Sequence, residues 1–329
     1  MNDIGTTTFL DIKQYGPKSQ SSHFSSEHKP GYQIDLPTVS MLPVKDILRN
    51  RILSLDIDRC ESDAENAFFV ANLDEVYNQH LRWKSLLPRI EPFYGTGFDC
   101  ASKVEIQTVL DIGVDPSKII YANPCKQASF VRYAAEHNVK MMTFDNSDEL
   151  YKIKRYFPDA QLVLRILTDD SMSLCKLGLK FGASLDSTGS LLQTARKLDL
   201  NVIGVSGCYD ENAFIDAVHR AKFVFDQASE LGFNFHLLDV GGGFSHSRDC
   251  DGITFEKIAA ILGPEIDSLF PPNVRVIAEP GRYYAAPAFT IATHIIARRT
   301  VLSNGDVQTL DMDTVLNDES PTREDHSGY

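Results

Sequence analysis

Two glycine-containing segments of this chain have residue types that suit an anionic, heterocyclic ligand. In the first segment, a β-rich run ends at Ala278 and leads into Glu279, Pro280, Gly281 and Arg282. A guanidinium beside a glycine, which admits close backbone approach, suits a phosphate group. A carboxylate at a strand end suits a protonated ring nitrogen. We therefore interpret Glu279, Gly281 and Arg282 as candidate ligand-binding residues.

The second segment lies upstream, where the apolar run Leu237–Val240 leads into Gly241, Gly242 and Gly243. Because no side chain covers glycine amides, they can converge on phosphate oxygens. Either segment alone is also consistent with a plain surface turn, and Glu279 with a surface acid. Since both segments follow an apolar run, we expect these glycines to form a phosphate cradle together with the first segment.

From Phe68 onward, short apolar runs alternate with helical patterns, mostly about twenty residues apart, which is typical of repeated βα units. The expected strands are Gly97–Ala101, Ile119–Ala122, Met141–Phe144, Leu162–Leu167, Val202–Ser206, Leu237–Val240 and Val274–Ala278, with a first strand at Pro92–Tyr94. We predict an α/β fold with a (β/α)8 barrel, which places functional residues at the carboxyl ends of the strands. A doubly wound parallel sheet is the alternative that the periodicity leaves open.

The patterning predicts three regions along the chain. Residues 1–40 are rich in Ser, Thr, Gly, Gln and His, and we expect a disordered tail. Residues 41–285 would form the barrel. The alternating run 288–297 would begin a second β-domain over residues 286–329, but without strand partners, and the polar, acidic stretch from residue 303 onward is expected to be loop or tail.

Composition excludes several classes of protein. The formal net charge of −13 argues against nucleic-acid binding, which requires a basic face. Six separate cysteines without a CxxC pair are typical of a reduced, intracellular chain, and nine histidines without HxH or HExxH spacing predict no metal site. Because no apolar run is long enough to cross a membrane and no signal-peptide pattern is present, we expect a soluble, cytoplasmic protein.

Several ordered blocks closely resemble the fold-type III pyridoxal-phosphate-dependent decarboxylases of ornithine, lysine and arginine, and above all those that act on ornithine. These blocks are residues 68–73 (FFVANL), 97–103 (GFDCASK), 121–127 (YANPCKQ), 164–166 (LRI), 168–170 (TDD), 179–183 (LKFGA), 237–244 (LLDVGGGF) and 276–284 (VIAEPGRYY). The resemblance covers residues 68 to about 302. It implies a TIM-barrel lyase that binds pyridoxal 5'-phosphate and forms a homodimer.

The resemblance also implies roles for individual residues. Glu279 would pair with the pyridinium nitrogen, and Arg165 would join it as a catalytic residue. Asp99 and Glu105 would line or support the cofactor pocket, although Glu105 could instead be only the acid of a capping box that begins at Ser102. The phosphate contacts would come from Gly241, Gly242, Gly243, Gly281 and Arg282.

The chain departs from this family where the first barrel strand should end. The family has a segment like PFYAVKCN, whose lysine attaches the cofactor covalently, followed by a helix. Here Pro92–Tyr94 runs directly into Gly95, Thr96 and Gly97, so the lysine and the helix are absent. Two adjacent parallel strands need a longer crossover, so we expect either an open barrel or a displaced Phe93 segment, with core and an unpaired edge exposed in both cases.

Two further departures affect the family's chemistry. The family has a segment like VSFHVGSGC where this chain has only Val205–Cys208, so the chain lacks a family histidine that stacks on the cofactor and a serine that contacts its phosphate. The family's C-terminal segment, which completes the site across the dimer, has no counterpart, so we interpret the chain as incomplete. Lys126 follows a strand and enters a first helical turn, where we expect a solvated side chain rather than a nucleophile.

These observations favour an ornithine decarboxylase by descent, an enzyme of polyamine biosynthesis that converts L-ornithine to putrescine. We expect the chain as written to be inactive, because its attachment lysine is absent. The alternative is a catalytically silent regulator that binds antizyme, since the surface between Asn123 and Phe144 is retained while the cofactor chemistry is lost. A cofactor-carrier barrel ranks last, because that class also needs the lysine.

Overall fold

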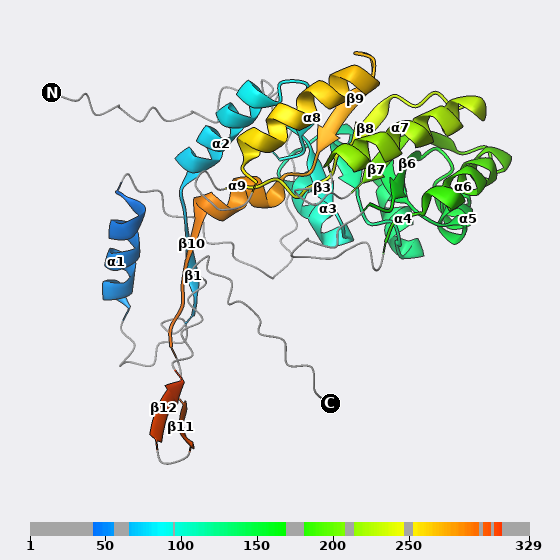
Figure 1. The fold of residues 1–329 in the computed structure, drawn as a ribbon. Coiled ribbons are helices and arrows are strands. Elements are labelled where there is room, and N and C mark those ends of the chain that lie inside the picture. Colours follow the sequence, from blue (N-terminus) through cyan, green and yellow to red (C-terminus); the bar gives the residue numbers. More distant parts are fainter. Residues whose placement is uncertain are drawn as a thin grey trace, which may run out of the picture. The chain divides into compact units, whose positions relative to one another are not determined.

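The computed structural model describes residues 42–55, 66–94, 96–168, 181–207, 214–246, 253–295, 299–303 and 306–310. The predicted N-terminal tail and the acidic stretch 311–329 lie outside the described residues, and the tail stays a prediction. Within the described part, strands and helices alternate along the chain (Figure 1). The helices are α1 (Val44–Ser54), α2 (Leu73–Leu86), α3 (Lys103–Asp111), α4 (Ala128–Glu136), α5 (Ser147–Tyr156), α6 (Leu185–Lys197), α7 (Phe214–Glu230), α8 (Phe255–Leu269) and α9 (Gly281–Ala288).

Eight parallel strands form one sheet in the order β2-β9-β8-β7-β6-β5-β4-β3. They are β2 (Ile90–Pro92), β3 (Phe98–Cys100), β4 (Ile119–Tyr121), β5 (Met141–Phe144), β6 (Gln161–Ile166), β7 (Asn201–Gly207), β8 (Leu237–Asp239) and β9 (Arg275–Ala278). From β3 to β9 the order follows the sequence without reversal. This sequential order is that of a (β/α)8 barrel, since a doubly wound sheet reverses direction at a switch point. The eight expected strands are confirmed to within about three residues at each end.

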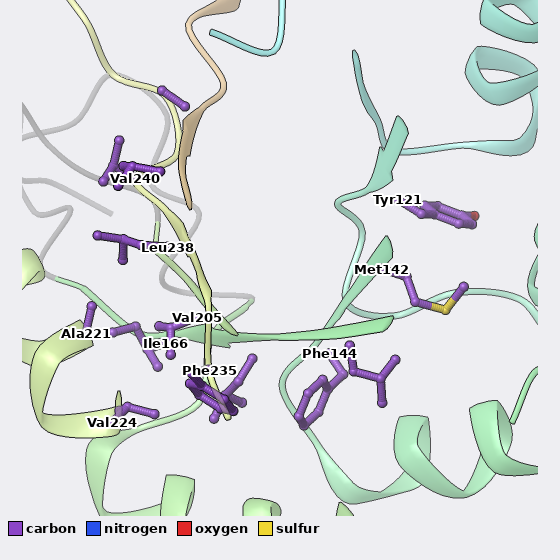
Figure 2. Packing of buried hydrophobic residues seen from close by; sticks show 14 of the residues in the cluster. Tyr121, Met142, Phe144, Ile166, Val205, Ala221, Val224, Phe235, Leu238 and Val240 are labelled. Carbon is purple, nitrogen blue, oxygen red and sulfur yellow. The ribbon is translucent and has the colours of Figure 1, made fainter. Parts of the chain in front are cut away.

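Alternate residues of each strand face opposite sides of the sheet. On one side, strand residues pack with helix residues in a large buried cluster; Figure 2 shows Tyr121, Met142, Phe144, Leu238 and Val224 of this cluster. On the other side, strand side chains pack against one another, as they do inside a barrel. We call this second cluster the apolar floor; it consists of Phe93, Ile120, Met141, Val163, Ile203, Leu237 and Ile277.

The sheet is curled but open, as expected from the short Tyr94–Gly97 connection. β2 and β3 lie at its two edges, and no ladder joins them among the residues that the structure describes. Instead, Tyr94 makes an isolated antiparallel bridge with Phe98. Phe93 is only 4% exposed, and a Cβ atom added to Gly97 would lie 2.7 Å from its ring. The expected exposure of this part of the core is therefore wrong, because the Phe93 ring occupies the space beside the gap.

Two short antiparallel ribbons lie outside the main sheet. β1 (Phe68–Ala71) pairs with β10 (Phe289–Ala292), so segments far apart in sequence run side by side (Figure 1). We expected the strand that begins near Phe289 to lack a partner, which is wrong because β1, which precedes the barrel, pairs with it. β11 (Arg299–Ser303) pairs with β12 (Asp306–Leu310), which corrects the expectation of loop or tail from residue 303 onward.

The helices of the described residues include none with the length and apolar character needed to span a bilayer.

Candidate functional site

Polar side chains replace apolar ones where the strands end. Arg165 and Asp239 each lie two residues after a member of the apolar floor, Val163 and Leu237 respectively, and therefore face the same side. The strand register aligns Arg165 with Ser206 and Ser206 with Asp239. The carboxyl end of the curled sheet thus has a polar layer above an apolar floor, which is the position of the site in barrel enzymes.

Asp239 joins the two glycine-containing segments predicted from the sequence. Its Oδ1 accepts a hydrogen bond from the Gly241 N–H at 2.9 Å, and the Gly241 carbonyl accepts one from the Glu279 N–H at 2.7 Å. The side chains of Ser206 and Glu279 also act on Asp239, since both oppose the rise of its pKa that burial causes. The ends of β8 and β9 are therefore tied together at the residues expected to hold a ligand.

The turn after β8 requires glycine for two reasons. Gly241 and Gly243 have φ values of +61° and +86°, which side-chain-bearing residues rarely adopt. At Gly242, a Cβ atom would lie 3.0 Å from the Glu279 carbonyl oxygen. The turn consequently leaves uncovered backbone beside Glu279, which is the geometry expected for a phosphate cradle.

Asp99 and Glu105 belong to the same electrostatic group. Solvent reaches the Asp99 side chain, but protein surrounds it on most sides, and this burial, together with the charges of Asp239 and Glu105, raises its pKa to about 7. The nearby Arg165 guanidinium opposes the increase. Asp99 thus titrates near neutral pH, in the range where a side chain can accept or donate a proton.

Glu105 takes part in capping α3, and its role beside a cofactor stays a prediction. Ser102 Oγ accepts a hydrogen bond from the Glu105 N–H at 3.3 Å, as a capping box predicts, whereas Glu105 Oε2 accepts one at 2.6 Å from the Ala101 N–H, one residue before the Ser102 N-cap. Its charge also contributes to the raised pKa of Asp99.

Gly281 and Arg282 begin α9, and the Gly281 N–H donates to the Glu279 carbonyl at 2.9 Å. Arg282 is exposed and lines a shallow hollow with Phe69 and Phe289. The structure therefore brings Asp99, Glu105, Arg165 and Glu279 together with the glycine turn, whereas it places Arg282 against the β1–β10 ribbon.

The model of the pyridoxal-dependent decarboxylase family, pyridoxal binding domain, matches residues 94–286. The chain belongs to this family. The match spans the sheet from its β3 edge to β9, the glycine turn and Glu279.

Comparisons with individual proteins support the same family and fold. Ornithine decarboxylase of Neurospora crassa is 52% identical over 301 residues, covering 84% of this chain and 61% of the relative. Antizyme inhibitor 2 of Xenopus laevis is 48% identical, covering 73% of this chain and 58% of that protein. The crystal structure of the Paramecium bursaria Chlorella virus arginine decarboxylase superposes with a TM-score of 0.71 at 30% identity, covering 81% of this chain and 75% of that one. The chain thus spans about 60% of the length of these curated relatives.

Sequence reasoning missed Asp239 and Ser206 as members of the site. Asp239 is fully buried, and this burial raises its pKa, while the Gly241 N–H, the hydroxyl of Ser206, Glu279 and the charge of Arg165 oppose the increase. An acid inside the apolar run before three glycines was a signal, because a buried carboxylate is costly unless a partner stabilises it.

The expectation that Lys126 is solvated is wrong. Its side chain is fully buried, and its Nζ lies 2.9 Å from Glu149 Oε1 and donates to the Thr143 carbonyl at 2.6 Å. Burial lowers its pKa, and Glu149 opposes the decrease. Its Nζ lies over the ring of Tyr121, which belongs to the helix-covered face of the sheet rather than to the apolar floor.

The residues present fit a phosphorylated pyridine in two respects. The glycine turn offers uncovered backbone beside Glu279, and Glu279 follows the end of β9 two residues after Ile277 of the apolar floor, which places it on the same face in extended backbone. Covalent attachment is a different matter, since β2 ends at Pro92 and no lysine lies between it and β3.

Proposed function

We propose that this chain descends from the ornithine decarboxylases, binds pyridoxal 5'-phosphate at the strand ends, and does not decarboxylate ornithine as its sequence stands. The observation that carries the proposal is the connection between Glu279, Gly241 and Asp239. It joins a carboxyl group suited to a ring nitrogen with a glycine turn suited to a phosphate.

Bound pyridoxal phosphate would supply an electron sink for the bond broken in decarboxylation. Glu279 would hold the proton on the ring nitrogen, and the amides of the glycine turn would orient the phosphate. Arg165 is 8% exposed and would stabilise negative charge in the polar layer above the apolar floor. The chain lacks the lysine that would attach the cofactor covalently and release it to the substrate.

Equilibrium titration with pyridoxal 5'-phosphate, followed by fluorescence of Trp83, tests the proposal. We expect saturable binding that weakens by at least about tenfold in Glu279→Ala, the equivalent of one charge-assisted hydrogen bond. Glu91→Ala, at an exposed ion pair with Arg275 on the adjacent strand, is the control and should bind normally. Equal affinities for wild type and Glu279→Ala would overturn the site.

The missing activity has its own measurement. Borohydride reduction followed by mass spectrometry should find no stoichiometric adduct at a single lysine, and labelled ornithine should release no CO2 above the buffer rate. A stoichiometric adduct at one lysine would show that another residue has replaced the family lysine, and the inactive assignment would be abandoned.

A second candidate function is a silent regulator that binds antizyme. The observations that favour it are the antizyme inhibitor relative and the absent lysine. The segment in question runs from Asn123 to Phe144 and includes α4, which has exposed residues, and β5, which is buried. A pull-down with antizyme tests it, and absence of binding at micromolar concentration would eliminate this candidate without affecting the cofactor site. The homodimer and the cytoplasmic location implied by the family are parts of the same proposal, testable by sedimentation and by imaging.

A further inference from the structure

The end of β6, which carries Arg165, is bound by a segment that returns to it from later in the chain. The Ala183 N–H donates to the Arg165 carbonyl at 2.9 Å, and the Ala183 carbonyl accepts from the Leu167 N–H at 2.8 Å. The two hydrogen bonds accompany an isolated parallel bridge between Ile166 and Ala183. Because Ile166 also pairs with β7, Ala183 lies on the other side of β6, beside which β5 has already ended.

The same segment is fixed to the end of β5 through Gly182. Its N–H donates at 2.8 Å to Oδ2 of Asp145, the residue that follows β5. Gly182 has a φ of +104°, and an added Cβ atom would lie 2.9 Å from the Leu167 Cα atom, so this position requires glycine. The segment 181–183 is therefore held by β5 and β6 together.

Phe181 begins this segment, and its ring meets the side chain of Arg165. The Arg165 Cζ atom lies over the ring, 5.4 Å from the ring centroid, which is within the range of a cation–π contact. Arg165 is buried, so little water competes with this contact. A phenyl ring attracts a guanidinium but carries no charge of its own. Phe181 can therefore orient Arg165 without neutralising it, which a carboxylate partner would do.

The charge of Arg165 acts on acids of two other strands. Burial raises the pKa of Asp99 on β3 and of Asp239 on β8, and the charge of Arg165 opposes the increase in both groups. The guanidinium over the Phe181 ring is thus close enough to the strand-end site to influence its acids.

We propose that Phe181 is a positioning residue for Arg165, and that it holds the guanidinium at the strand-end site, where it meets an anionic group of a bound ligand. The contacts of Gly182 with Asp145 and of Ala183 with β6 fix the place of Phe181. The part of this inference that concerns a ligand rests on the proposed function, whereas the contact between Phe181 and Arg165 does not.

The positioning can be measured without any ligand, because Asp99 responds to the charge of Arg165. The side-chain carboxyl 13C signal of Asp99 would be followed by NMR against pH in wild type, Phe181→Leu and Phe181→Tyr. In Phe181→Leu the guanidinium loses the ring that holds it, so the Asp99 midpoint should rise by at least about 0.3 pH unit, a twofold change in proton affinity. Phe181→Tyr keeps the ring and should match wild type, as should Phe223→Leu at an exposed position of α7.

Three results would overturn the positioning role. An unchanged Asp99 midpoint in Phe181→Leu would mean that Arg165 keeps its place without the ring. A lower midpoint would mean that the substitution admits water to Asp99 and does not move the guanidinium. An equal shift in Phe181→Leu and Phe181→Tyr would mean that the ring is not the relevant feature. If Phe181→Leu failed to fold, Phe181→Met would give the same comparison, because its flexible side chain fills the space without a ring.

The ligand part is tested by titrating the same variants with pyridoxal 5'-phosphate. Affinity should fall by about threefold to tenfold in Phe181→Leu and should be normal in Phe181→Tyr. Normal affinity in Phe181→Leu, together with a raised Asp99 midpoint, would mean that Arg165 does not face the ligand and would contradict this part. Absence of binding by the wild type would refute the proposed function, while the Asp99 titration would still decide whether Phe181 positions Arg165.

Discussion

Two groups of buried charges lie on opposite faces of the same sheet, and their balance of partners differs. The Lys126 network consists of Lys126, Glu149 and Lys152 beneath α4 and α5. Glu149 is paired through both oxygens, with Lys126 Nζ at 2.9 Å and Lys152 Nζ at 2.5 Å, and the lysines also donate to carbonyl groups. In the strand-end site, Asp239 and Glu105 both raise the pKa of Asp99, the charge of Arg165 acts on both Asp99 and Asp239, and Asp239 Oδ2 has no donor among the described residues.

The difference suggests that the charges of the Lys126 network stabilise the fold, whereas those of the strand-end site are available to a ligand. A buried ion that is fully paired loses little by staying in place and has no capacity for a further partner. In a site with more carboxyl groups than cations, repulsion between the carboxylates raises their pKa values. A ligand that brings a proton acceptor or a positive charge reduces this repulsion. We therefore expect mutations in the Lys126 network to affect mainly stability. Mutations in the strand-end site should affect mainly ligand binding.

The largest effect should come from breaking the Lys126 network. Glu149→Gln leaves the Lys126 ammonium buried without a counter-ion, and removing one partner of such a pair costs about 3–5 kcal/mol. Urea unfolding followed by far-UV circular dichroism measures the loss. Asp148→Asn, on the adjacent exposed residue, is the matched control and should change stability by less than about 0.5 kcal/mol. A small loss in Glu149→Gln would mean that Lys126 becomes neutral at little cost, and the contrast between the regions would fail.

An intermediate effect is expected at the glycine turn. In Gly242→Ala, the new methyl group would press on the Glu279 carbonyl at 3.0 Å, so either the turn or the end of β9 must shift. We expect a loss of about 1–3 kcal/mol in unfolding free energy, as for other overpacked positions, together with weaker binding of pyridoxal 5'-phosphate. Gly189→Ala in α6, where the methyl group would meet Gln227 at an ordinary 3.6 Å, is the control. Unchanged cofactor affinity in Gly242→Ala would remove the turn from the site.

The sheet and most of the site could be predicted because they depend on local patterns. Apolar runs at βα spacing predicted the strands, and the Ser102–Glu105 pattern predicted a helix start at which Ser102 Oγ accepts from the Glu105 N–H. The acid at the end of β9 and the glycines after β8 meet because parallel strands end at the same edge.

What could not be predicted depends on long-range burial. Lys126 has the sequence context of a solvated lysine at a helix start. Its burial is stabilised by an ion pair with Glu149, which lies 23 positions later in the sequence. The pairing of β1 with β10 joins segments more than two hundred residues apart. The role of Asp239 likewise depends on which residues lie opposite it in β7 and β9.

The smallest expected effect is a pH dependence at Asp99, and its sign distinguishes a strained acid from a paired one. Burial, Asp239 and Glu105 raise its pKa from 3.8 to about 7, so the folded protein holds a proton that the unfolded chain releases between these values. Stability therefore falls as the pH rises from about 4 to about 7. Asp99→Asn should match wild type below pH 4 and become more stable above pH 7. Because solvent screens the side chain, we expect a difference on the order of 1 kcal/mol.

Chemical unfolding of both proteins across this pH range measures the difference, with Asp148→Asn as an exposed control that should run parallel to wild type. If Asp99→Asn were instead less stable above pH 7, the attraction of Arg165 for Asp99 would outweigh the repulsion among the acids, and the strand-end site would be balanced like the Lys126 network.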